Sequence, residues 1–450
     1  MIFSSPIFLF SFLPVVFILY RLSKKDAYRN VLLAAASLIF YAFGQLQYVP
    51  LFLLSVMINY AAGLILRRRK SKAVLGMALT LNVALLCIFK FSAELGLTGL
   101  ALPIGISFFT FQGMSYVIDT YREPEKGTAD FLKLFLYISF FPRLIAGPIV
   151  PYHAIESQLG SRECTAEDAA DGIRRFILGL SKKMLLAEPL AYAADQVLQR
   201  FSAEGVRDVR LAWIFALCYM LQLYYDFSGY SDMAVGTGRM FGFSFPENFD
   251  RPYGAGSIKE FWRKWHISLS SWFKEYLYIP LGGNRKGKLR AAANRMLVFL
   301  CTGLWHGAGL TYLFWGIGHG VLSSLEDLQV IPTEKLGKSR AGRITMRLYT
   351  LLAVCLLFVI FRSESLGQGL SIIGTMFAGT ACAEANLLIA RLITPAFLFV
   401  FTVALLGAGN LPARGKISKP LSYVLSIMLL LLSVLALAKS GSTPFIYAQF

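Results

Sequence analysis

Long apolar runs separated by short basic loops constrain this chain more than any other feature of its sequence. Five such runs fill the first 118 residues, at about 6–20, 31–43, 50–66, 73–91 and 101–118. Each is near the length of about 20 residues that an α-helix needs to cross a bilayer. With 56% hydrophobic and only 16% charged residues, a soluble protein of 450 residues could not bury so many apolar side chains. We therefore predict an all-α polytopic integral membrane protein.

The basic residues indicate how the chain is oriented in the membrane. Clusters at 21–29 and 67–72 alternate with connections at 45–49 and 92–99 that contain no Lys or Arg. Short loops rich in Lys and Arg stay on the cytoplasmic side, so both termini are predicted to be extracytoplasmic. The same distribution accounts for the net charge of +18, and we exclude nucleic acid as a partner.

Between residues 131 and 227 the apolar runs are broken or paired. Residues 131–150 are interrupted by prolines, so this segment is predicted to dip into the membrane and return, buried against protein. Runs at about 184–198 and 209–227 are predicted to form a pair. The glycines and prolines that follow Asp226 predict short helices and loops rather than one long span.

The last part of the chain contains five more apolar runs. Those at about 291–305 and 309–327 have basic residues at both ends, which favours a hairpin, with a single tilted span as the alternative. Three further runs follow at about 348–361, 388–408 and 421–439. In total we predict eleven to thirteen membrane segments, including re-entrant and interfacial helices.

A basic and aromatic segment, residues 246–295, precedes the predicted hairpin. Between residues 251 and 295 there are ten Lys or Arg and two acids, a net charge of about +8, which predicts a cytoplasmic location. Aromatic rings are mixed with these cations, as in the headgroup layer of a membrane: Trp262, Trp265, Trp272, Tyr276 and Tyr278. We expect short helices at the cytoplasmic interface here, and simple anchoring to lipid is the alternative to a functional role.

His306 is the one group in the apolar run 296–314 that can titrate near neutral pH. A helix that enters the membrane near Arg295 would carry His306 about 16 Å deep, close to the middle of a hydrocarbon core about 30 Å thick. An ionisable group is costly to bury there, so a functional role is the first hypothesis. The alternative is a neutral histidine that is hydrogen-bonded between helices.

Several long blocks of the sequence resemble the membrane-bound O-acyltransferase (MBOAT) family. Together they cover nearly the whole chain, and they are far more specific than a short glycine motif. Two blocks contain histidine, Trp-His-Ile-Ser-Leu-Ser and Gly-Leu-Trp-His-Gly, and the blocks lie at residues 103–112, 140–148, 225–234, 265–270, 276–285, 303–307 and 444–450. The chain is more similar to the alginate O-acetyltransferase branch than to the D-alanyl-lipoteichoic acid branch.

The resemblance implies an MBOAT fold, one transmembrane domain of residues 1–450 that is surrounded by membrane lipid in a bacterial plasma membrane. Its parts are N-terminal spans (1–150), a catalytic region (151–327) and C-terminal spans (328–450). The implied activity is acyl transfer from a cytoplasmic thioester, either acetyl-CoA or a carrier-bound acyl group, for O-acetylation of a polysaccharide outside. Such proteins work with a separate extracytoplasmic esterase-like transferase of the SGNH type, which is the expected protein partner.

The resemblance also assigns catalysis to two histidines. His306 matches the catalytic histidine of the membrane-embedded site, and His266 matches the second histidine, in the cytoplasmic segment. A neutral imidazole is suited to take the proton from an acceptor hydroxyl as its oxygen attacks the thioester. For His266, a structural hydrogen bond to a backbone carbonyl is the alternative.

Other side chains are candidates for binding and orientation. Because cations stabilise phosphate oxygens, donor or substrate binding is assigned to the cations of the basic segment and to nearby polar and aromatic groups: Lys259, Trp262, Arg263, Lys264, Asn248, Trp305 and Tyr276. Asp226, Gln222 and His319 are candidates to orient His306 through its other ring nitrogen. For His319, a structural role is the alternative.

Several other kinds of site are excluded. The six cysteines are widely separated, and no zinc-protease spacing or serine-hydrolase elbow occurs, so neither a metal site nor a bound cofactor is expected. Ser271 and Lys274 fit a Ser-x-x-Lys pattern, but the motifs that accompany it in serine enzymes are missing.

Two kinds of alternative function stay open at this point. One is a related transfer, of D-alanyl groups from a carrier protein to teichoic acid. The other is a polysaccharide or lipid transporter, or a scaffold, with no chemistry of its own. Transporters often contain repeated halves and several intramembrane carboxylates, and we find no repeat and few such acids.

The predicted topology can be tested by labelling cysteines in intact cells. A Gly287→Cys variant should react with an impermeant thiol reagent only after the cells are opened, because residues 285–295 are predicted to be cytoplasmic. Gly96→Cys, in a loop predicted to be outside, should react in intact cells and is the control. Labelling at position 287 from outside would overturn the topology.

Overall fold

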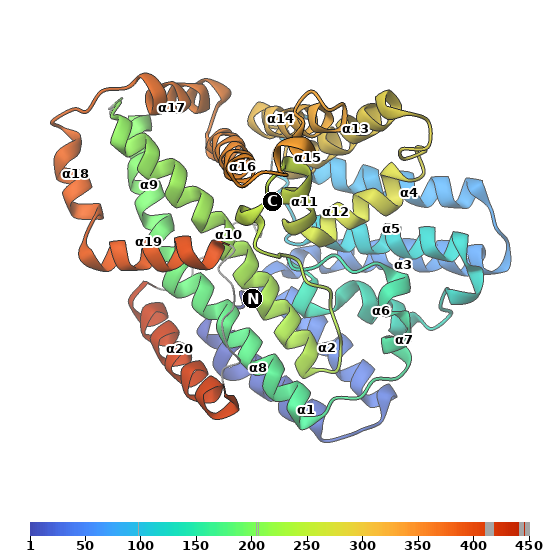
Figure 1. The fold of residues 1–450 in the computed structure, drawn as a ribbon. Coiled ribbons are helices and arrows are strands. Elements are labelled where there is room, and N and C mark those ends of the chain that lie inside the picture. The colour runs from blue at the N-terminus through green and yellow to red at the C-terminus, as the bar shows by residue number, and fades with distance from the viewer. Residues whose placement is uncertain (98, 204, 206, 410–417, 441–444, 446–450) are drawn as a thin grey trace. The chain divides into compact units, whose positions relative to one another are not determined.

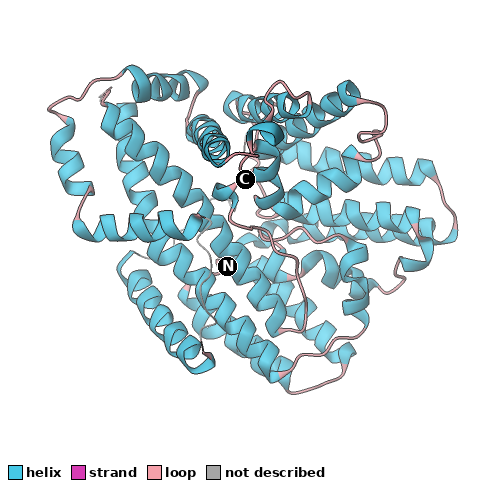
Figure 2. Cartoon of the chain, in the orientation of Figure 1, coloured by secondary structure: helices cyan, strands magenta, loops and turns pink. Residues whose placement is uncertain are grey.

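The structure is a computed structural model that describes all residues except 98, 204, 206, 410–417, 441–444 and 446–450. Figure 2 shows that the described chain consists of helices and loops and contains no strand, which confirms the all-α prediction. The described residues form two compact units, unit 1 (residues 1–180, 229–247 and 423–450) and unit 2 (181–228 and 248–422). The functional division of the chain made from the sequence stays a prediction.

Unit 1 contains the five N-terminal apolar runs, each of which forms a helix as predicted. In Figure 1, α3, α4 and α5 lie side by side, and α2 packs on α6. The elements of this unit are η1 (Phe8–Phe12), α1 (Leu13–Arg21), α2 (Asp26–Gln45), η2 (Leu46–Tyr48), α3 (Val49–Arg68), α4 (Lys72–Lys90), α5 (Ile106–Arg122), η3 (Pro124–Lys126), α6 (Phe131–Ser139), η4 (Phe141–Arg143), α7 (Tyr152–Gly160), α8 (Ala166–Ser181), and parts of α10 (Val209–Met240) and α20 (Lys419–Ser440).

The broken segment 131–150 is buried against protein, as predicted. Helix α6 ends at Ser139, and the chain continues as the short η4 and an irregular stretch. Arg143 is fully buried and donates to the backbone carbonyls of Tyr137 and Val150, while the Tyr137 hydroxyl donates to the Val150 carbonyl at 3.0 Å. These bonds satisfy the carbonyls of a non-helical backbone, which is tolerated at membrane depth only where protein encloses it.

The prediction that short helices and loops follow Asp226 is wrong as far as Met240, because α10 continues unbroken to that residue, and it is confirmed beyond Met240, where a loop leads to short helices. The glycines of this stretch allow a close helix crossing with α8. A Cβ atom added at Gly172 would lie 2.6 Å from the Gly236 carbonyl, and one added at Gly236 would lie 2.5 Å from the Gly172 carbonyl. Small residues let two helix backbones approach closely, so here glycine marks a helix contact and not a break.

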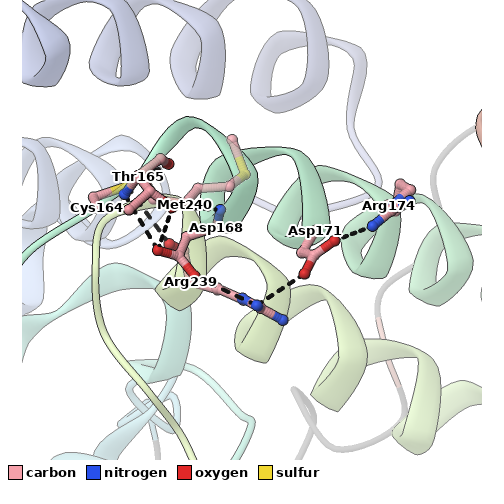
Figure 3. A network of polar contacts seen from close by, with 7 residues as sticks. All are labelled: Cys164, Thr165, Asp168, Asp171, Arg174, Arg239 and Met240. Atoms are coloured by element: carbon pink, nitrogen blue, oxygen red, sulfur yellow. Dashed lines mark hydrogen bonds and ion pairs between the residues drawn. The ribbon is translucent and has the colours of Figure 1, made fainter. Parts of the chain in front are cut away.

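Polar contacts join the start of α8 to the end of α10, as Figure 3 shows. The Thr165 hydroxyl donates to Asp168 at 2.6 Å in the first turn of α8, and Arg239 near the end of α10 pairs with Asp168 and with Asp171. The Cys164 thiol donates to the Met240 carbonyl at 3.1 Å. The start of α8 is therefore held against the end of α10.

Unit 2 contains the basic segment and the predicted hairpin. Its elements are η5 (Lys182–Ala187), α9 (Glu188–Ala203), the first part of α10, η6 (Pro252–Gly254), α11 (Ile258–Lys264), α12 (Ile267–Phe273), η7 (Lys274–Tyr278), α13 (Lys288–His306), α14 (Leu310–Asp327), α15 (Thr333–Leu336), α16 (Arg340–Arg362), α17 (Leu366–Ala378), α18 (Ala385–Leu392) and α19 (Pro395–Ala408). The basic segment forms the short helices that were predicted.

The hairpin is confirmed, and the single tilted span is wrong. Helices α13 and α14 lie side by side (Figure 1) and are joined by a turn that begins at Gly307. A Cβ atom at Gly303 would lie 2.7 Å from the Tyr312 carbonyl, and one at Gly316 would lie 2.5 Å from the Phe299 carbonyl. The two backbones are thus as close as glycine allows.

One prediction for the C-terminal runs needs correction. The run 388–408 is not one helix but the pair α18 and α19, bent by 70°. The residue before a proline disfavours the α conformation, and Thr394, which precedes Pro395, instead caps α19 by accepting from the Phe397 amide. The sequence also gave no signal for α17. Of the C-terminal block 444–450, only Phe445 is described, and the loop with Arg414 and Lys416 lies outside the described residues.

Four helical stretches among the described residues are long and apolar enough to cross a membrane: Asp26–Arg68, α4, α16 and Lys419–Lys439. The bent pair of α18 and α19 would be a fifth, and Phe8–Arg21 and α17 are shorter apolar helices. These features support a multi-pass membrane protein. The count of eleven to thirteen membrane segments stays a prediction.

The closeness of α13 and α14 predicts that Gly316→Ala destabilises the protein. The new methyl group has no room beside the Phe299 carbonyl, and overpacking of this kind costs about 1–3 kcal/mol. The melting temperature in detergent should fall accordingly. Gly374→Ala in α17 is the matched control, because nothing lies within 4 Å of its Cβ position; alanine there should be neutral or slightly stabilising. Equal melting temperatures for both variants would contradict the close crossing.

Candidate active site

His306 is the last residue of α13 and lies in an enclosure of aromatic rings. Its side chain is 4% exposed. Ring centroids lie 4.8 Å away for Trp305, 5.2 Å for Trp315 and 5.0 Å for Phe361, which reach it from α13, α14 and α16. A titratable group at the tip of a tightly packed hairpin is thus shielded from bulk water by three hydrophobic neighbours.

His266 lies on the other side of Trp305. Its ring contacts that of Phe227 at 4.6 Å and that of Trp305 at 6.2 Å. The residue has φ 44° and ψ 53°, a left-handed conformation that is uncommon for a residue with a side chain, and it is the N-cap that precedes α12. Such strained residues persist only where their surroundings fix them, and they cluster at functional sites.

Asn248 fixes the tautomer of His266. The Asn248 side-chain oxygen accepts from the Ser268 amide at 3.1 Å and from the Ser268 hydroxyl at 2.8 Å, and His266 Nδ1 lies 3.3 Å from it. A backbone amide can only donate, so this oxygen is an acceptor and Nδ1 must donate to it. The lone pair of the neutral ring is therefore on Nε2. Burial lowers the pKa of His266 to about 3, so the ring stays neutral near pH 7.

His319 holds the opposite tautomer. It is fully buried on α14, and its Nδ1 accepts from the indole nitrogen of Trp262 at 3.2 Å. Because indole can only donate, the proton of neutral His319 is on Nε2. Its ring lies 5.0 Å from that of Trp315, the same ring that contacts His306.

The structure therefore brings three predicted histidines into one aromatic cluster. In spatial order its rings are His266, Trp305, His306, Trp315, His319 and Trp262. The sequence did not predict that His266 and His306, which are 40 positions apart, would both contact the ring of Trp305.

A pocket of about 290 Å³ lies beside this cluster. It is lined from α11, α12, η7, α13 and α14, and one of its lining residues is Trp262. Another is Thr302, which stands four residues before His306 on α13, about 6 Å along the helix axis. The pocket thus approaches the aromatic cluster at two points.

Four cations line this pocket: Lys259, Arg263, Lys274 and Arg295. Lys259 pairs with Asp327 at 2.7 Å, and Arg295 pairs with the same carboxylate. In the part of the chain that the structure describes, Arg263 and Lys274 form no ion pair. Two cations therefore have no compensating carboxylate at ion-pair distance, which suits an anionic ligand.

Acidic residues at the end of α14 also position α11, the helix that carries two of these cations, Lys259 and Arg263. The fully buried Glu326 accepts from the backbone amides of Ile258 at 2.7 Å and Lys259 at 3.1 Å, in the first turn of α11. A carboxylate at a helix N-terminus satisfies free amides and complements the helix dipole. Glu326 and Asp327 thus attach α11 to the hairpin.

The remaining predicted site residues lie elsewhere in unit 2. Lys264 pairs with Glu260 at 2.8 Å, and Tyr276 packs against the ring of Trp272 at 5.1 Å. Asp226 accepts from the buried Lys183 at 2.6 Å, and Lys183 also pairs with Glu188 at 2.7 Å. Gln222 lies one turn before Asp226 on α10 and is buried. The assigned roles of these residues stay predictions.

Several residues of this site were not found from the sequence. Phe361 gave no signal, because any apolar run contains rings. Glu326 and Asp327, in contrast, could have been found from a signal in the sequence. Two adjacent acids close an apolar run that follows a segment with a charge of about +8, so they were the natural partners for its cations.

The chain was compared with known proteins. A sequence model of the MBOAT, membrane-bound O-acyltransferase, family matches residues 42–366. A Pseudomonas putida protein named probable alginate O-acetylase AlgI is 36% identical over a 497-residue alignment that covers 100% of both chains. A peptidoglycan O-acetyltransferase of Helicobacter pylori is 36% identical over 424 residues, 84% of this chain and 80% of that one.

The chain is also similar to proteins that are named for D-alanyl transfer to teichoic acid. A teichoic acid D-alanyltransferase of Bacillus subtilis is 28% identical over 266 residues, 57% of this chain and 65% of that one. This similarity is lower and covers less of the chain, so the chain is nearer to the O-acetylating relatives.

Proposed function

Because the chain belongs to the MBOAT family and is an O-acyltransferase, we propose that it moves an acetyl group from a cytoplasmic thioester for O-acetylation of an extracytoplasmic polysaccharide. One observation carries the proposal: a pocket with two cations that form no ion pair among the described residues meets the aromatic cluster around His306. The pocket supplies a place for an anionic donor, and the cluster supplies a buried imidazole.

The donor enters this pocket from the cytoplasmic side of the basic segment. Acetyl-CoA and the phosphopantetheine arm of a carrier protein both bear phosphates, and Arg263 and Lys274 are the cations positioned to bind them. The acyl end of the donor is directed along α13, past Thr302 toward His306. Of the two donors, acetyl-CoA is the one we propose, because relatives that match most of the chain are named O-acetylases and an O-acetyltransferase.

The chemistry follows from a neutral imidazole in a site that excludes water. The acceptor oxygen attacks the thioester carbonyl while His306 takes its proton, so that a carbon–oxygen bond forms and a carbon–sulfur bond breaks. The proton then passes from His306 to the departing thiolate. General base catalysis of this kind contributes about 10²- to 10⁴-fold in rate. His266, with its lone pair on Nε2, is the second histidine of the reaction.

The acceptor and the protein partner are proposed from the relatives. The similar proteins are named for alginate and for peptidoglycan, both polymers outside the plasma membrane. We propose a polysaccharide acceptor of this kind, reached through an extracytoplasmic esterase-like transferase of the SGNH type. Transport or scaffolding without chemistry does not fit the membership in an acyltransferase family.

His306→Gln should abolish polymer acetylation. Glutamine keeps a hydrogen-bonding side chain of similar size but cannot accept the proton, so the rate should fall by about 10²- to 10⁴-fold. The readout is acetyl transfer from labelled acetyl-CoA in membranes, at equal amounts of folded protein.

Glutamine is the informative substitution here. His306→Ala would leave a cavity among Trp305, Trp315 and Phe361, so its inactivity could reflect lost packing. Near-normal acetylation by the glutamine variant would make His306 a packing residue and His266 the candidate base.

Arg263→Ala and Lys264→Ala should differ in their effect on the donor. Arg263 lines the pocket, whereas Lys264 is paired with Glu260 and is absent from the pocket wall. Loss of one charge-assisted hydrogen bond costs about 1.5–3 kcal/mol, so Arg263→Ala should raise the KM for acetyl-CoA by about 10- to 100-fold, and Lys264→Ala should leave it near wild type. If both variants had the same KM for acetyl-CoA, we would conclude that the donor does not bind in this pocket.

A further inference from the structure

Trp262 connects the pocket to His319, which the sequence offers only as a candidate to orient His306. Its ring lines the pocket, and its indole nitrogen donates to His319 Nδ1 at 3.2 Å. The same ring contacts those of Phe299 at 5.2 Å and Trp315 at 5.6 Å. One side chain therefore meets both the space for a ligand and the interior of the hairpin.

His319 is built as a fixed hydrogen-bond acceptor. Its ring is fully buried and lies nearly parallel to that of Phe261, with an interplanar angle of 3° and centroids 6.2 Å apart. The ring of Phe299 stacks on it at 6.0 Å. These rings pack against His319 and hold its Nδ1 toward the indole nitrogen of Trp262.

Trp315 lies between His319 and His306 but cannot relay a proton from one to the other. The Trp315 ring lies 5.0 Å from His319 and 5.2 Å from His306. An indole has one N–H donor and no acceptor, so it cannot take up a proton from one histidine and pass it to the other. The contacts of Trp315 with the two histidines are therefore packing contacts.

We propose that His319 is a positioning residue that holds Trp262 in the wall of the donor pocket. It acts on donor binding, whereas His306 acts on the proton. The proposal rests on the proposed function, because it takes the pocket to be the site of the acyl donor. A thioester donor with an extended arm needs a pocket wall of fixed shape, and Trp262 provides a flat apolar face there beside Arg263.

Two substitutions separate the hydrogen bond from the bulk of the ring. In asparagine the amide oxygen stands two bonds from Cβ, as Nδ1 does in histidine, so His319→Asn can still accept from Trp262. In glutamine the amide lies one bond further, near the position of Nε2, so His319→Gln cannot. Thr350→Val is the control for a buried polar change, since the Thr350 hydroxyl bonds only its own helix, at Met346.

The first measurement needs no donor. In protein with labelled tryptophan, the indole N–H resonance of Trp262 is identified by its disappearance in Trp262→Phe. It should keep its hydrogen-bonded position in the asparagine and Thr350→Val variants and move upfield in the glutamine variant. An unmoved resonance in His319→Gln would show that His319 does not hold Trp262, and would overturn the proposal.

The second measurement uses acetyl-CoA as the probe. A net hydrogen bond of typical strength corresponds to about a 2- to 10-fold effect, so His319→Gln should raise the KM by that factor with kcat near wild type, and His319→Asn should restore it. Trp262→Phe should raise the KM too, and the double variant with His319→Gln should be no worse than the worse single variant.

The possible failures are distinguishable. A fall in kcat at unchanged KM in His319→Gln would assign His319 to the chemical step and overturn the positioning role. An unchanged KM, with the resonance moved, would separate Trp262 from donor binding and overturn it as well. Failure of the wild-type protein to use acetyl-CoA would instead contradict the proposed function, and the indole resonance would still decide whether His319 holds Trp262.

Discussion

The close crossing of α13 and α14 is the contact on which the candidate site depends. Where Gly303 and Gly316 let the backbones approach, the side chains on either side of the crossing are forced together. Trp315 is brought against His306 at one level and against His319 at another. The far end of α14 then provides Glu326 and Asp327, to which α11 and two pocket cations are bound. A wider spacing of this hairpin would separate the cluster and release the basic segment from it.

Much of the fold follows from the lengths of the apolar runs and from the prolines that interrupt them. The five N-terminal runs, the broken segment at 131–150 and the hairpin were predicted because chain length and prolines decide them locally. The errors have tertiary causes. Gly229 and Gly236 suggested a break in α10 but serve a helix crossing, and the Thr394–Pro395 bend splits a run whose hydropathy is continuous. Helix α17 is too short to register as a span.

The candidate site was predictable as a set of residue types but not as an arrangement. The histidine blocks pointed to His306 and His266, whereas the ring of Trp305 between them is a property of the folded chain. From the sequence, Lys259, Arg263 and Lys264 were equally good candidates to bind the donor, and Lys274 was not among them. Lys264 turns to Glu260 within one helix, and Lys259 turns to Asp327, because each satisfies the acid that folding brings nearest. The Lys264–Glu260 pair has the i,i+4 spacing of a helix and could have been predicted, whereas the Lys259–Asp327 pair depends on a distance that no local pattern encodes.

The shared carboxylate of Asp327 has a consequence for selectivity. Lys259 and Arg295 both pair with it, so the pocket shows the surroundings less positive charge than its four cations suggest. At physiological ionic strength, exposed charges are screened beyond about 8 Å, and small cytoplasmic anions gain little from a pair of exposed cations. A ligand must therefore add apolar contact to its charge before it is retained. In this way we expect the pocket to favour an anion with a long organic arm over free phosphate or chloride.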